Sequence, residues 1–149
     1  MAGQYTDLQY RYRGFVRDQY GNITTFDVPG AANAPGEGTF AWSINDGGAI
    51  AGHYTDKAFK AHAFIRDQFG QFTTFDAPGA VYGTFAHSIN SDGSVAGYYS
   101  DANGFPRGFV RDKYGNFTEV DAPGQSYGTV LLSINDLCAV AGYNTAPIP

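Results

Sequence analysis

Apolar and polar residues alternate over short stretches of this chain, and each stretch is followed by a turn signal. Over residues 39–45, Phe40, Trp42 and Ile44 alternate with smaller or polar neighbours, which is the period of two expected of a β-strand. The Asp-Gly-Gly that follows predicts a tight turn into a second strand. Because no long stretch has helical periodicity, the pattern predicts an all-β fold.

Three segments of the chain carry the same motifs in the same order. The motifs are Phe15–Asp18, Phe64–Asp67 and Phe109–Asp112, then Asp27–Gly30, Asp76–Gly79 and Asp121–Gly124, then Ser43–Asn45, Ser88–Asn90 and Ser133–Asn135. Equivalent asparagines lie 45 residues apart, and an insertion falls in a loop near residues 33–36. Each unit of about 45 residues predicts four short strands, the last followed by an Asp-x-Pro-Gly turn of type II.

The repeat predicts a single domain over residues 1–149, with units at about 14–60, 61–107 and 108–144. Residues 2–13 resemble the end of a preceding unit, because Gln4–Asp7 matches His53–Asp56. One unit is therefore divided between the two ends of the chain. We expect its parts to pair, within one molecule or between two, so that fewer sheet edges stay exposed.

The third unit departs from the pattern at its first turn, where Cys138 replaces the glycine found at Gly48 and Gly93. Because a residue other than glycine disfavours a positive φ, we expect this turn to take another shape. Cys138 is also the only cysteine, which excludes an internal disulfide and a zinc site built from cysteines.

Composition and charge exclude several partners. The net charge is −5, the pI is about 4.9, and the few lysines and arginines are scattered. Nucleic-acid binding needs a basic stripe, so no nucleic acid is expected as a partner. No apolar stretch approaches the roughly 20 residues that span a bilayer, so no membrane insertion is expected. Residues 1–5 lack the charged and apolar regions of a signal peptide.

No arrangement of residues predicts catalysis. Ser43, Ser88 and Ser133 lie on regular predicted strands and not at a Gly-x-Ser-x-Gly elbow. The three histidines, at positions 53, 62 and 87, occupy different places in the repeat, so they predict no symmetric metal cluster. We therefore expect no enzyme, no cofactor and no metal, and a hydrolase is the least favoured function.

Repeated charged and amide residues are assigned to structure. They are Arg17, Arg66 and Arg111, then Asp27, Asp76 and Asp121, then Asn45, Asn90 and Asn135. Neighbours on a strand point to opposite faces, so each arginine cannot pair with the aspartate beside it. We expect each arginine to pair instead, across strands, with the aspartate of Asp-x-Pro-Gly.

Positions that differ between units at one structural place are the candidate ligand-binding residues. Trp42, His87 and Leu132 are equivalent, each three residues before the repeated asparagine. They either fill a core layer of varying size or form a ring of ligand contacts. Tyr82 and Tyr127 lie in loops beside a glycine, where a tyrosine ring can stack on a sugar, on another subunit or on its own unit.

The succession of motifs resembles the bacterial extracellular HAF repeat family. Ser-Ile-Asn-Asp-x-Gly leads to Gly-x-Tyr, then to a triplet ending in phenylalanine, then to Phe-Thr-Thr-Phe-Asp-x-Pro-Gly. The triplet His-Ala-Phe itself is present at 62–64, with Arg-Gly-Phe at 13–15 and 107–109. The resemblance covers nearly the whole chain and implies propeller-like β-blades and an extracellular location. It implies no catalytic residues, and three copies are fewer than longer members have.

Closed propellers have about four to eight blades, so three units predict blades that close into a ring by self-association, six in a dimer or nine in a trimer. A threefold β-trefoil or β-prism is the alternative. For function, we expect a non-catalytic, lectin-like module that binds a glycan multivalently on this homo-oligomeric ring. The alternative is a purely structural subunit that assembles into a ring, tube or filament.

Overall fold

The computed structural model describes residues 1–123 and 127–145, which form thirteen strands and no helix. The strands are β1 (Ala2–Thr6), β2 (Tyr12–Arg17), β3 (Ile23–Phe26), β4 (Thr39–Ile44), β5 (Ile50–Thr55), β6 (Ala61–Arg66), β7 (Phe72–Phe75), β8 (Gly83–Ile89), β9 (Val95–Ser100), β10 (Pro106–Arg111), β11 (Phe117–Val120), β12 (Gly128–Ile134) and β13 (Val140–Thr145). The all-β prediction is confirmed, and these strands form no closed barrel. Gly124, which ends the third Asp-x-Pro-Gly motif, lies outside the described residues.

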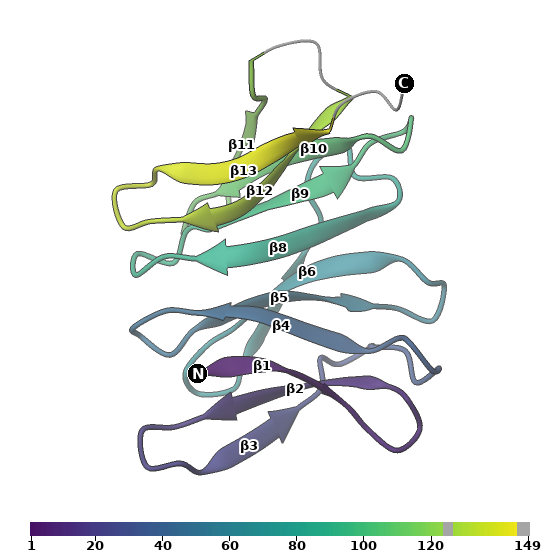
Figure 1. The fold of residues 1–149 in the computed structure, drawn as a ribbon, viewed down its shortest axis with the longest axis vertical. Coiled ribbons are helices and arrows are strands. Elements are labelled where there is room, and N and C mark those ends of the chain that lie inside the picture. The colour runs from purple at the N-terminus through teal and green to yellow at the C-terminus, as the bar shows by residue number, and fades with distance from the viewer. Residues whose placement is uncertain (124–126, 146–149) are drawn as a thin grey trace.

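The strands stack as four layers along the long axis of the molecule (Figure 1). Layer 1 is the antiparallel sheet β1-β2-β3, and layer 4 is the hairpin β12-β13. Layer 2 (β4–β7) and layer 3 (β8–β11) are antiparallel meanders, joined into one eight-stranded sheet by a single parallel bridge between Ala61 and Gly83. Layers 1 and 4 lie at opposite ends of the stack and do not pair with each other within the chain.

The apolar core lies between consecutive layers. Between layers 1 and 2, Phe26 packs with Ile50 and Phe64. The cluster between layers 2 and 3 contains Ala63 and Phe109, and a third cluster joins layers 3 and 4 through Ala96, Leu131 and Ile134. Each layer therefore depends on its neighbours for burial of its apolar side chains.

A phenylalanine on the third strand of each of layers 2 and 3 is fully buried. Phe64 is 0% exposed, and its ring lies over Gly52, where an added Cβ would come within 2.9 Å of the ring. The same Cβ would also collide with the carbonyl oxygen of Phe40, so only glycine fits at position 52. Phe109 is 1% exposed in the corresponding place in layer 3.

The repeated asparagines link the first strands of successive layers. Asn45 Nδ2 donates to the carbonyl oxygen of Asn90 at 2.9 Å, and Asn90 Nδ2 donates to that of Asn135 at 3.1 Å. Ser43 Oγ accepts from the backbone N–H of Ile89 at 3.3 Å, and the same bond recurs one layer further on. Each asparagine also accepts a backbone N–H within its own turn. These side chains form a polar ladder along β4, β8 and β12.

The turn at Cys138 keeps the shape of its glycine counterparts, contrary to the expectation from sequence. Cys138 has φ +59°, beside +80° at Gly48 and +89° at Gly93. Its N–H donates to the carbonyl of Asn135 at 3.0 Å, as Gly48 donates to Asn45. The hydrogen-bonding asparagine dictates the turn, so the cysteine adopts the left-handed backbone at a cost in strain.

The expected arginine–aspartate pairs are also different. Asp27 pairs with Arg13, not with Arg17. His62 and Arg107 hold the other two motif aspartates in the same way, at 2.9 Å and 3.9 Å. The Arg66 and Arg111 guanidinium groups instead lie over phenylalanine rings of the preceding layer, 5.0 Å and 4.7 Å from the ring centres. These arginines therefore stabilise contacts between layers, not within one.

Candidate functional site

Three β-bulges determine where the side chains of the variable residues Trp42, His87 and Leu132 point. The register between first and second strands shifts between Ala41 and Ser43 in layer 2, and at the same place in layers 3 and 4. The residues inside the shifts are Trp42, His87 and Leu132. A bulge inserts one residue that has no partner on the facing strand, and it bends the strand locally.

The bulge also reverses the expected alternation along β4. The sequence pattern places Ile44 on the face of Phe40 and Trp42. In the structure, Ile44 packs with Ala41 in the core between layers 1 and 2. The extra residue moves every later side chain to the other face, so Phe40 and Trp42 are left on the side away from that core.

The bulge residues do not form a buried core layer. Trp42 is 48% exposed and Leu132 is 47% exposed, while His87 is partly buried. The sequence allowed either a filled core layer or a ring of ligand contacts at these positions. The exposure of Trp42 and Leu132 argues against the filled core layer.

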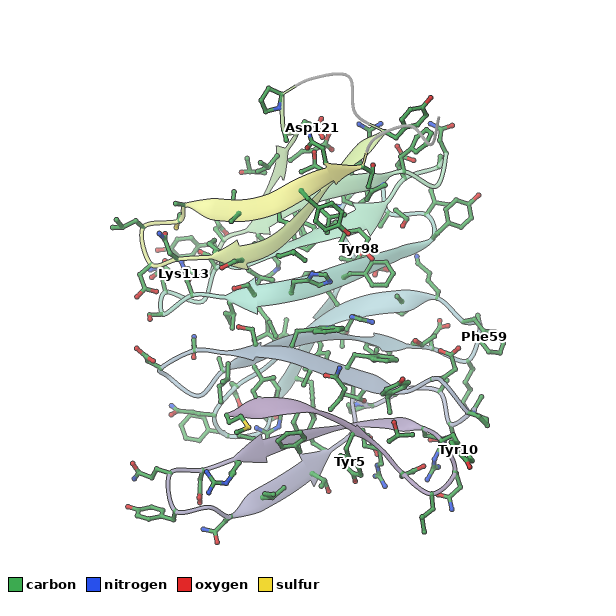
Figure 2. The ribbon with its side chains drawn as sticks, in the orientation of Figure 1. Tyr5, Tyr10, Phe59, Tyr98, Lys113 and Asp121 are labelled. Atoms are coloured by element: carbon green, nitrogen blue, oxygen red, sulfur yellow. The ribbon has the colours of Figure 1, made fainter. Side chains whose placement is uncertain are left out.

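Aromatic rings from three layers form a continuous row on this face, which we call the bulge row. Successive ring centres are 4.5–6.1 Å apart. The members are Tyr12, Phe40, Trp42, His53, Phe85, His87 and Tyr98. Figure 2 shows this face toward the viewer, with Tyr98 labelled beside β8. Trp42 and His87, the two bulge residues predicted from sequence, lie 5.5 Å apart between ring centres.

His53 fixes the orientation of Trp42. The indole Nε1–H donates to His53 Nδ1 at 3.1 Å, so the imidazole accepts there and carries its proton on Nε2. His53 is only 9% exposed, and burial, together with the nearby His87, lowers its pKa to about 3. Burial also lowers the pKa of His87. The row is therefore uncharged at neutral pH and holds the indole ring in one position.

The two loop tyrosines lie apart from Trp42, at the starts of β8 and β12. Tyr82 is 60% exposed, and its N–H donates to the carbonyl of Ser100. Tyr127 is 48% exposed and packs edge-on against Phe105, 5.2 Å away between ring centres. The structure thus brings Trp42 and His87 together and leaves each tyrosine on its own loop.

Sequence reasoning did not find His53, Phe40, Phe85 or Tyr98 as members of the row. Phe40 pairs with His53, and Phe85 pairs with Tyr98, directly across neighbouring strands. The signal was present in two of the units, because aligning their first and second strands places an aromatic residue opposite another aromatic or a histidine.

Other chemistry in the described part of the chain is limited. Over residues 1–123 and 127–145, no three histidine, cysteine or acidic side chains are arranged to hold a metal ion. Over the same ranges there is no helix of the length and apolarity needed to cross a membrane. The most perturbed hydroxyl is that of Tyr99, whose pKa is raised to about 12 by burial and by its 2.6 Å hydrogen bond to Glu119.

Comparison with protein-family models, with curated proteins and with solved structures finds no match to this chain.

Proposed function

We propose that this protein is a non-catalytic, lectin-like binding module whose ligand lies on the bulge row. The observation that carries the proposal is the recurrence of the bulge in three layers, each time at the residue that varies. A bulge weakens strand pairing, so its repetition at a variable and exposed residue supports a binding role.

The chemistry of the row favours a ligand with an apolar face and hydroxyl edges, such as a pyranose ring. The half-exposed indole of Trp42 provides a flat surface for stacking, and its orientation is held by His53. The hydroxyl of Tyr98 and the imidazole of His87 lie beside it as hydrogen-bonding groups. The row carries no charge at neutral pH, so an ionic ligand has no counter-charge there.

We also propose a propeller-like arrangement, with each layer as one blade. Meanders of four antiparallel strands, stacked face to face with cores between them, are compatible with blades around an axis. The resemblance to HAF repeats supports the same arrangement and an extracellular location. One bulge row on each chain of a ring would give multivalent binding, in which weak individual affinities combine.

Trp42 allows a direct test because it is the only tryptophan in the chain. A glycan array identifies binders, and titration of each binder is followed by tryptophan fluorescence and by calorimetry. We expect ligand to change the emission, and Trp42→Leu to weaken the calorimetric affinity by about tenfold or more. Leucine occupies the equivalent bulge at position 132, so this variant keeps the fold.

Tyr82→Ala is the matched control, because it removes an exposed aromatic ring outside the row. Unchanged binding in Tyr82→Ala and weakened binding in Trp42→Leu would locate the site on the row. A folded protein that binds no glycan overturns the lectin-like proposal, and equal binding by both variants overturns the choice of the row.

A further inference from the structure

An open apolar pocket of about 370 Å³ lies between layer 3 and the end layer 4. Val120 and Ala122 line it from layer 3, and Leu131 and Val140 line it from layer 4. Gly142 is also part of the lining.

The aligned positions between layers 2 and 3, and between layers 1 and 2, surround a buried phenylalanine. In layer 2 the residue enclosed is Phe64, and its neighbours in the cluster are Phe26, Val28, Ala41 and Ile50. These four align with Val120, Ala122, Leu131 and Val140, and Gly52 aligns with Gly142. In layer 3, Phe109 is buried in the same way. The pocket is therefore a phenylalanine site that no described residue of this chain fills.

Phe15 shows the opposite situation in layer 1. It lies on β2 at the place of Phe64 and Phe109 and contacts Gly3, whose added Cβ would be 3.0 Å from the ring. It remains partly exposed, whereas its two counterparts are buried. The hexapeptide Arg-Gly-Phe-Val-Arg-Asp that contains it at 13–18 is identical to residues 107–112, which already pack in such a site.

We propose that layer 1 of a second copy of this chain docks against layers 3 and 4, with Phe15 of that copy in the pocket. The match between an unfilled site and a half-covered side chain identifies the occupant. This proposal is independent of ligand binding, because one copy already presents the bulge row.

The count of strands determines how the two layers combine. Layer 1 has three strands and layer 4 has two, whereas layers 2 and 3 have four each. β1 and β13 both align with the second strand of a layer, so a shared four-stranded layer has room for only one of them. We place β13 in the shared layer, because its Val140 and Gly142 line the pocket, and β1 of the second copy is displaced.

Sedimentation velocity over a range of concentrations tests the association. We expect the wild-type chain to sediment at twice its 16.0 kDa mass or more, and Phe15→Ala to remain at 16.0 kDa. Tyr20→Ala is the matched control, because it removes an 81% exposed ring from the β2–β3 turn of the same layer and should leave association intact.

A second variant changes the other side of the contact. Val120→Trp places in the pocket a ring larger than the phenylalanine at the aligned positions 26 and 75, so it occupies the space that Phe15 needs. It too should be monomeric. A mixture of Phe15→Ala and Val120→Trp retains one intact phenylalanine and one intact pocket, so we expect a complex of two chains only in the mixture.

Circular dichroism verifies the fold of each variant, and Val120→Trp decides the outcome should Phe15→Ala unfold. A wild-type chain that stays monomeric at its highest soluble concentration overturns the proposal. Wild-type association that both variants leave unchanged overturns it equally, since another surface would then be responsible.

Discussion

The buried imidazole of His53 predicts a specific loss of stability in mild acid. Its pKa falls from 6.5 to about 3 in the folded chain, through burial first and the charge of His87 second. Between these two pH values the unfolded chain binds a proton that the folded chain does not bind. The free energy of unfolding therefore decreases as pH falls from about 7 toward 3, by at most about 1.4 kcal/mol per pH unit.

From pH 7.5 to pH 5.0, this single proton removes about 2 kcal/mol of stability. His53→Gln eliminates the effect and keeps an acceptor for the indole N–H of Trp42, and glutamine is already present at the equivalent position 4. Aspartates with lowered pKa values, such as Asp7 and Asp18, act only around and below their usual 3.8, outside this range. The difference between wild type and variant thus isolates the imidazole.

Urea unfolding at the two pH values measures this difference. With an m value of about 2 kcal/mol/M, the wild-type midpoint should fall by about 1 M more than that of His53→Gln. His87→Leu is the comparison variant, since leucine occupies the equivalent bulge at 132 and the imidazole removed is less buried. It should reduce the pH dependence less. Parallel pH curves for wild type and His53→Gln would show that the folded state protonates His53 normally, which refutes the neutral, buried imidazole.

Five further substitutions test the turn, the ladder and the buried hydroxyl by urea unfolding. Cys138→Gly should stabilise the fold by about 1 kcal/mol, because glycine relieves the left-handed backbone, whereas Cys138→Ala should give no such gain. Asn90→Ala should destabilise the fold by about 2–3 kcal/mol, because this 3% exposed amide joins two layers. Asn135→Ala should destabilise it clearly less, because Asn135 is exposed. Tyr99→Phe should lower the free energy of unfolding by about 1–2 kcal/mol, because it removes the hydrogen bond to Glu119. If the Tyr99 phenol titrates at the same pH as the exposed tyrosines, the raised pKa of Tyr99 is contradicted.

Strand positions were readable from the sequence because alternation, turn glycines and Pro-Gly pairs are all local signals. The strand at 39–45 was expected from the alternation of Phe40, Trp42 and Ile44, and β4 covers Thr39–Ile44. The bulge within it was not readable, because no residue type marks the extra residue. The sequence pattern therefore places Ile44 on the face of Phe40 and Trp42, whereas the structure places it in the core with Ala41. The environment of Trp42 could be recognised only from the structure.

Partners of side chains were harder to predict than strands. The motif aspartates were assigned to Arg17 and its equivalents, but the register places Arg13, His62 and Arg107 nearer. Contacts between layers also involve residues about 45 positions apart, such as Asn45 and Asn90. Only the spacing of the repeat pointed to such contacts, and it did not specify which atoms would meet.

The polar ladder has a direction, and that direction affects how the protein can change in length. The asparagine rungs all run one way, with an amide N–H of one layer donating to a carbonyl of the next. The serine rungs all run the other way, with a backbone N–H of the next layer donating to the serine. A chain with one more or one fewer layer would form the same rungs, so each inserted layer would contribute about the same interfacial free energy. Duplication or deletion of a 45-residue segment therefore requires no new interface, and chain length can vary in steps without redesign of the core.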